Sequence, residues 1–149
     1  MSILDAMFEF SDAQDLTATD AADNVIDLQD SDLELGAGNP MYLNVRVGDT
    51  ALTSAGGTAV LDISLVGDVD ATIDGSSIVV TSTKQWTEAE CVAGAWLMRQ
   101  ALPVDFDADQ YIGIYYTVST EDFTGGNINA WIDNGNQSSY DTQVSESNI

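Results

Sequence analysis

Short runs in which apolar and polar residues alternate dominate the sequence from residue 41 onward. In 41–47, apolar side chains take every second position around Tyr42, Asn44 and Arg46, and 59–65, 111–118 and 128–132 alternate in the same way. Successive side chains of a β-strand point to opposite faces, so each run predicts a strand with one face on a core and the other toward solvent. Many short strands joined by Gly-rich turns predict an all-β fold, a jelly roll or β-sandwich.

Two further segments carry local signals. Asp74-Gly75 is a tight-turn dipeptide and predicts a hairpin over 72–83. Thr87 and Glu90 have the spacing of a capping box, which predicts a short helix over 88–93. Gly94 interrupts the helical pattern, and the residues that follow predict a strand over 95–102. We therefore expect at most one short helix in the chain.

The charge balance restricts what the protein binds. The 149 residues include 25 acidic and three basic side chains and no histidine, for a formal charge of −22. Nucleic acids and anionic membranes are bound mainly through Lys and Arg, so we expect the protein to bind neither. Few carboxylates have a cation to pair with, and such a surface is suited to a saline setting, where salt screens its self-repulsion.

The residue types also argue against enzymatic chemistry. Without histidine there is no Ser-His triad, and the sequence has no phosphate-binding GxxxxGK[ST] loop. With 25 acids, some pair of carboxylates always has the spacing found in glycosidases, so such a pair is no evidence for a glycosidase active site. Cys91 is the lone cysteine. We expect no catalytic site and no cofactor.

One acidic run resembles the start of a calcium loop. Asp105, Asp107 and Asp109 alternate, but Gln110 stands where the loop requires glycine and Tyr116 where it requires glutamate. A helix-loop-helix calcium site is therefore not expected, and no metal site is assigned to this or any other acidic loop.

The length suits one domain with three parts. Residues 1–40 carry ten acids and no cation, and are expected to form an N-terminal arm and edge strands of the same domain. Residues 41–133 form the β-sandwich core in this interpretation, and 134–149 a polar C-terminal tail.

Several segments together resemble a known protein family. They are Ile3-Leu4-Asp5-Ala6, Phe10-Ser11-Asp12-Ala13-Gln14, Asn24-Val25-Ile26-Asp27-Leu28, Gly36-Ala37-Gly38-Asn39-Pro40 running into Met41-Tyr42-Leu43-Asn44-Val45, Leu102-Pro103, Tyr111-Ile112-Gly113-Ile114-Tyr115-Tyr116 and Thr124-Gly125-Gly126-Asn127-Ile128-Asn129-Ala130-Trp131. Over roughly residues 1–133 this ordered set is similar to the capsid cement, or decoration, proteins of tailed bacteriophages, the type first named from a Bordetella phage.

The resemblance implies a jelly-roll homo-oligomer, a dimer or a trimer. It would sit on the outer surface of an icosahedral head, at junctions between major capsid proteins, and stabilise the shell of a virion assembled in the bacterial host cytoplasm. The chain departs from the family at Gln110, where a basic residue commonly precedes the Tyr111 strand.

Five apolar or aromatic residues are candidates for contacts with a neighbouring subunit or with the major capsid protein. They are Phe8, Phe10, Ile26, Leu28 and Trp131. The alternative for these side chains is that they cover the domain's own core. A different function also remains open, that of a carbohydrate-binding jelly-roll module on a virion or cell surface, with Trp131 in an aromatic sugar platform.

Overall fold

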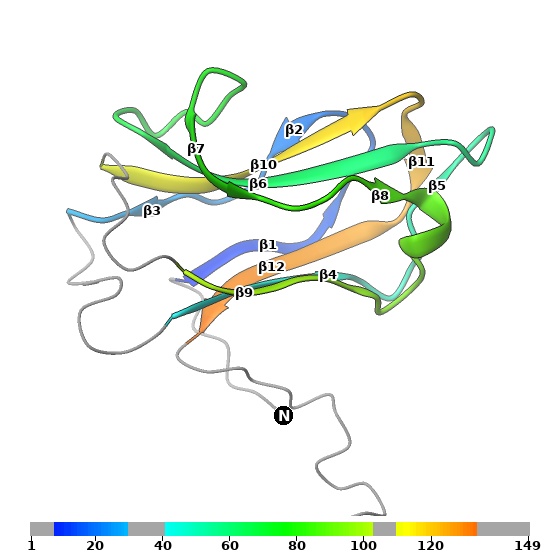
Figure 1. Ribbon diagram of the computed structural model, residues 1–149, viewed down its shortest axis with the longest axis horizontal. Coiled ribbons are helices and arrows are strands. Elements are labelled where there is room, and N and C mark those ends of the chain that lie inside the picture. Colours follow the sequence, from blue (N-terminus) through cyan, green and yellow to red (C-terminus); the bar gives the residue numbers. More distant parts are fainter. Residues whose placement is uncertain (1–7, 30–40, 103–109, 134–149) are drawn as a thin grey trace, which may run out of the picture.

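The protein is a sandwich of two antiparallel β-sheets that face each other across one core (Figure 1). The structure is a computed structural model, and it describes residues 8–29, 41–102 and 110–133. In spatial order, the four-stranded sheet contains β1 (Glu9–Asp15), β12 (Asn127–Asp133), β4 (Tyr42–Val47) and β9 (Trp96–Ala101).

The six-stranded sheet is built on two long central strands. β10 (Tyr111–Ser119) and β6 (Val60–Asp68) pair along their whole lengths, from Tyr111 opposite Asp68 to Ser119 opposite Val60. The short strands on the β10 side are β2 (Asp20–Ala21) and β3 (Ile26–Asp27), and those on the β6 side are β7 (Ile78–Ser82) and β8 (Trp86–Thr87). A separate two-stranded pair joins β5 (Thr53–Ser54) to β11 (Phe123–Gly125).

The order in which the chain visits the two sheets is that of a jelly roll. β1 lies in one sheet, β2 and β3 in the other, and the chain then changes sheet before β4, β6, β9, β10 and β12 in turn. Double-sheet jelly rolls of this kind pair strands that are distant in sequence. The expected all-β sandwich, with the strands predicted over 41–47, 59–65, 95–102, 111–118 and 128–132, is confirmed.

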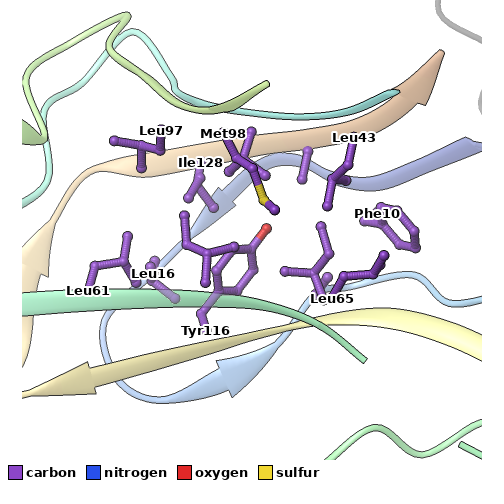
Figure 2. Close-up of a cluster of buried hydrophobic side chains, with 14 of the residues drawn as sticks. Phe10, Leu16, Leu43, Leu61, Leu65, Leu97, Met98, Tyr116 and Ile128 are labelled. Carbon is purple, nitrogen blue, oxygen red and sulfur yellow. The ribbon is translucent and has the colours of Figure 1, made fainter. Parts of the chain in front are cut away.

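The core explains the alternation. Leu43, Val45 and Val47 of β4 are fully buried against Leu61, Ile63 and Leu65 of β6 and the apolar face of β10. Figure 2 shows this layer, with Phe10 and Leu16 of the N-terminal segment packed into the same cluster. Within the described residues, no helix is long and apolar enough to span a membrane.

Two local predictions are only partly right. The turn at Asp74-Gly75 forms, with the Ser77 N–H donating to the Asp74 carbonyl, and the strand after it is β7. The first strand of the hairpin predicted over 72–83 is absent, because β7 pairs with β6 and the residues between them form a loop. The helix over 88–93 is a single 3-10 turn, η2 (Glu88–Glu90), although Glu90 does accept a hydrogen bond from the Thr87 N–H. Gly94, at a φ of +75°, redirects the chain into β9, and pairing with β4 outweighs the local helical preference.

Candidate interaction surface

The five residues predicted as contacts lie in the core, at its margin and on the outer face of the four-stranded sheet. Phe10 and Ile26 are at most 4% exposed within the core, and Phe8 and Leu28 are partly buried and pack against it. In the single chain these four side chains therefore cover the protein's own hydrophobic interior, which is the alternative that the sequence left open, whereas Trp131 is 3% exposed and packs against Trp96 outside the core cluster. Contacts between them and another chain stay a prediction.

The N-terminal strand is anchored by buried polar groups as well as by Phe10. Ser11 and Gln14 of β1 are both buried, and the Ser11 hydroxyl lies 2.7 Å from the Gln14 Oε1 atom and 2.8 Å from the Tyr116 hydroxyl. The Gln14 amide also donates to the Ala21 carbonyl. These bonds connect β1 to the opposite sheet, so the described part of 1–40 is an integral layer of the fold.

An aromatic and cationic cluster lies on the outer face of the four-stranded sheet. The rings of Trp96 and Trp131 meet edge to face with centroids 5.6 Å apart. The Arg99 guanidinium lies 4.2 Å from the Trp96 centroid and that of Arg46 lies 5.5 Å from it, both within cation–π range. We call these four residues the tryptophan–arginine cluster. Asn44, on the same strand as Arg46, is fully buried beside it.

A shallow depression of about 320 Å³ lies next to this cluster. Its walls carry carboxylate and amide groups together with Arg46 and Trp131; the polar members are Glu9, Asp12, Asp49, Asn127 and Asn129. Partial burial, and then the charge of Asp12, raise the pKa of Glu9. Trp131 is only 3% exposed, so its ring face is not open for a sugar to stack on.

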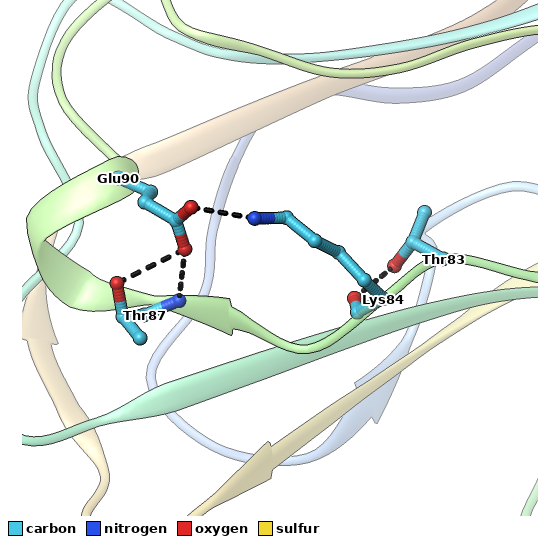
Figure 3. A network of polar contacts seen from close by, with 4 residues as sticks. All are labelled: Thr83, Lys84, Thr87 and Glu90. Atoms are coloured by element: carbon cyan, nitrogen blue, oxygen red, sulfur yellow. Dashed lines mark hydrogen bonds and ion pairs between the residues drawn. The ribbon is translucent and has the colours of Figure 1, made fainter.

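The third cation forms a compact network with the 3-10 turn (Figure 3). The Lys84 ammonium lies 2.5 Å from a Glu90 carboxylate oxygen. It also lies 4.3 Å from the Trp86 ring centroid. The other Glu90 oxygen accepts hydrogen bonds from the Thr87 N–H and hydroxyl. The hydrogen bond from Lys84, and then those from Thr87, lower the pKa of Glu90 to about 2. The network fixes the connection between β8 and β9.

The acidic loops hold their carboxylates by hydrogen bonds within the loop. Asp68 accepts from the Ser77 hydroxyl, and Asp74 accepts from both the hydroxyl and the N–H of Ser76, which lowers the pKa of each carboxyl group. Across 8–29, 41–102 and 110–133, no group of three or more acidic or cysteine side chains is arranged to hold a metal ion. Asp105, Asp107 and Asp109 lie outside the described residues.

Cys91 is not suited to nucleophilic chemistry. Its side chain is fully buried, and burial together with the charges of Glu90 and Glu88 raises its pKa to about 11. A thiol in such surroundings stays protonated at neutral pH and out of contact with solvent.

Charge is distributed unevenly around the sandwich. Residues 8–29, which form β1, β2 and β3 along one side, contain six acids and no cation. Two of the three cations belong to the other half, Arg99 on β9 and Lys84 between β7 and β8, whereas Arg46 of β4 also lines the depression beside Glu9 and Asp12. A contact between Gln100 of β9 and Thr81 of β7 joins the two edge strands on this second side.

Exposed apolar residues near β7 are a feature that the sequence reasoning missed. Ile78 and Val79 are each 57% exposed, and Val69, which follows β6, is 62% exposed. The signal was present in the sequence, because Ile78-Val79-Val80 is an apolar run without alternation, but alone it did not distinguish a buried strand from an exposed edge.

Comparison with known proteins gives the chain a family. No curated protein matches it significantly. The family model described as Bbp16 matches residues 10–132, from within β1 to within β12. The match spans both sheets of the jelly roll and most of the sequence, and the chain belongs to the Bbp16 family, a Bordetella phage protein family.

Proposed function

We propose that this protein is a capsid cement protein of a tailed phage. It binds the outer surface of the icosahedral head at junctions between major capsid proteins, as a homo-dimer or homo-trimer, and stabilises the shell. The observation that carries the proposal is the Bbp16 family match over residues 10–132, on a chain whose ordered motifs resemble phage cement proteins.

The surface chemistry is compatible with this role. A cement protein needs a rigid domain and adhesive surfaces, and it has no need of an active site, a cofactor or a metal. A charge of −22 repels the genome, so the protein remains free to reach the outer shell during packaging. In this proposal the protein binds neither nucleic acid nor membrane and is not an enzyme.

The acidic side made by β1, β2 and β3 is the proposed contact with the capsid. Six acids without a cation require a basic partner surface, or enough salt to screen the repulsion. Charge pairs at a wet interface set the rate and specificity of association more than the affinity. We therefore expect the capsid protein to present Lys and Arg at its site for this side.

Co-sedimentation with purified expanded heads that lack the protein tests the proposal. We expect saturable binding and a higher temperature of shell disruption. The double variant Asp20→Lys/Asp23→Lys should bind more slowly and weakly, because both exposed side chains lie on the acidic side. Asp70→Lys/Asp122→Lys makes the same charge change at exposed positions elsewhere and should bind like the unmodified protein. Heads that neither bind the protein nor gain stability from it would show that the proposal is wrong.

The carbohydrate-binding alternative has weaker support. The depression beside Trp131 has the amide and carboxyl groups that bind sugar hydroxyls, but the indole that would stack on a sugar is buried. Glycan binding that is lost on Asn129→Ala would favour this alternative over the cement role.

A further inference from the structure

The tryptophan–arginine cluster extends to β9, the edge of the four-stranded sheet that is opposite β1. Across β4 and β9, Arg46 pairs with Trp96 and Asn44 pairs with Arg99, and the core-facing residues of β4 alternate with them. These four side chains therefore lie on the face of the sheet that is turned away from the core. Arg46 is partly buried and donates from its Nε atom to the Gly94 carbonyl at 3.0 Å, whereas Arg99 is exposed.

The Arg99 side chain is fixed in position but has no acidic partner. Its guanidinium lies 4.2 Å from the Trp96 ring centroid. With the residues of 8–29, 41–102 and 110–133 it makes neither an ion pair nor a side-chain hydrogen bond, although the chain has 25 acids. Stacking uses the flat face of a guanidinium and leaves the N–H donors at its edge available. The ring also restricts the side chain, so less conformational entropy is lost when a partner binds.

The surroundings of Arg99 contain few acids. β4 and β9 have six residues each, and together they contain both arginines and no acid. The acids of the depression lie beside Arg46, and Arg99 is not among the residues that line it. Asp133, at the end of β12, accepts a hydrogen bond from the Trp131 indole N–H at 3.3 Å. An anionic group therefore meets local attraction at Arg99, although the chain as a whole carries −22.

The chemistry of the cluster favours a carboxylate as the bound group. Guanidinium groups bind carboxylates and phosphates through two parallel hydrogen bonds. Nucleic acids and anionic membranes bring many negative charges against the whole surface, which a chain of −22 repels. An acidic side chain on a protein brings a single charge to one point. Tryptophan and arginine are also the residue types that most often dominate the binding energy of protein interfaces.

We propose that the tryptophan–arginine cluster is a second capsid contact, at which Arg99 binds an acidic side chain of a major capsid protein. The inference deepens the proposed function and rests on it, because it assumes that the protein bridges two capsid subunits. One subunit then meets the acidic β1–β3 side with basic residues, and the other meets the β9 edge with acidic residues. Two contacts of opposite charge fix the orientation of the protein across the junction.

Co-sedimentation of the full-length protein with DNA-free expanded heads that lack it tests the inference. Arg99→Gln should weaken binding by about tenfold. Arg99→Lys should weaken it less, because it keeps the charge but loses the planar pair of donors. The unfolding temperature of Arg99→Gln should be nearly unchanged, since Arg99 is exposed. Lys84→Gln is the matched control: it also removes one cation, but Lys84 lies outside the cluster, in an ion pair with Glu90, so binding should stay at the unmodified level.

Carbodiimide crosslinking identifies the bound group. The reagent joins a carboxylate to an amine that is in contact with it, and the chain has one lysine, Lys84. When Arg99→Lys is bound to heads, the introduced amine should form an amide bond with an Asp or Glu of the major capsid protein. The unmodified protein should give no crosslink from this position. Mass spectrometry of the crosslinked peptides locates both ends.

Three results would overturn the inference while leaving the proposed function intact. The first is binding of Arg99→Gln to heads as tightly as the unmodified protein. The second is an equal loss of binding in Lys84→Gln, which would show that only the total charge matters. The third is an introduced amine that crosslinks to no capsid carboxylate, or only to another copy of this chain. Heads that do not bind the unmodified protein would overturn both proposals.

Discussion

The hydroxyls of Ser11 and Tyr116 lie 2.8 Å apart in the interior, although 105 positions separate them in the sequence. Ser11 gives its proton to the Gln14 carboxamide oxygen, so the tyrosine hydroxyl donates to Ser11. Both side chains are fully buried. Through this chain of bonds the N-terminal strand β1 is connected across the sandwich to β10, the central strand of the opposite sheet.

Tyr116→Phe should lower the free energy of unfolding by about 1 kcal/mol, because it removes one buried hydrogen bond while Ser11 keeps its bond to Gln14. For a domain of this size the unfolding temperature should fall by about 2–4 °C. Chemical denaturation with urea measures the change. An unchanged midpoint would show that the Ser11–Tyr116 bond contributes nothing to stability.

Phe10→Ala should destabilise the fold by about 3–5 kcal/mol, because its side chain is fully buried and its removal leaves a cavity in the core. Phe8→Ala should cost clearly less, since Phe8 is only partly buried at the margin. Equal costs in urea unfolding would contradict the placement of β1 inside the sandwich.

Gly126→Ala should be strongly destabilising. Gly126 has a φ of +105°, and a Cβ atom there would lie 2.4 Å from the Ala51 carbonyl oxygen, a backbone atom that cannot rotate away. Gly57→Ala is the control, since Gly57 also has a positive φ, +72°, but no atom within 4 Å of the added carbon. Gly57→Ala should cost only the conformational strain, about 1–2 kcal/mol, and Gly126→Ala more. If the two variants unfold at the same temperature, the close approach of Gly126 to Ala51 is wrong.

The Lys84–Glu90 network should contribute to stability in a defined pH range. The pKa of Glu90 is lowered in the folded protein from its ordinary 4.5 to about 2. Its contribution is therefore present above pH 4.5 and is lost as the pH falls toward 2. In Lys84→Met the pKa of Glu90, followed by NMR titration of its carboxyl carbon, should rise toward 4.5, with the bonds from Thr87 holding it partly below. A pKa that does not move would exclude Lys84 as the main cause.

Added salt should raise the unfolding temperature. With 25 acids and three cations, folding brings many unpaired carboxylates close together, and ions shorten the range of their repulsion from about 10 Å at 0.1 M to about 3 Å at 1 M. Differential scanning calorimetry at NaCl concentrations from about 0.05 M to about 1 M measures the change in unfolding temperature. An unfolding temperature independent of salt would show that the acidic surface is neutralised in some other way.

The long alternating segments were predictable because burial of one face imposes a period of two, as in β4, β6, β10 and β12. The partner of β7 and the end of the helix predicted over 88–93 were not, because long-range pairing of β7 with β6 and of β9 with β4 decides both, although the Asp74-Gly75 turn and the Thr87–Glu90 capping bonds do form. The jelly-roll strand order depends on pairs distant in sequence, which no local pattern contains.

The surface was less predictable than the fold. The exclusion of histidine chemistry followed directly from composition, but sequence could not tell that Trp131 is buried edge to face against Trp96 while Ile78 and Val79 are exposed. The alternation of apolar and polar residues in the sequence does not say which face of a strand is buried. Only the packing of the two sheets decides which of them meets solvent.

A cryo-electron-microscopy reconstruction of the mature head tests the central proposal most directly. It should show a jelly roll for each copy on the outer surface, across junctions between major capsid proteins, with the acidic β1–β3 side against basic residues of the shell. A head whose outer surface lacks this density, or a virion in which the protein lies inside the shell or in the tail, would contradict the cement role.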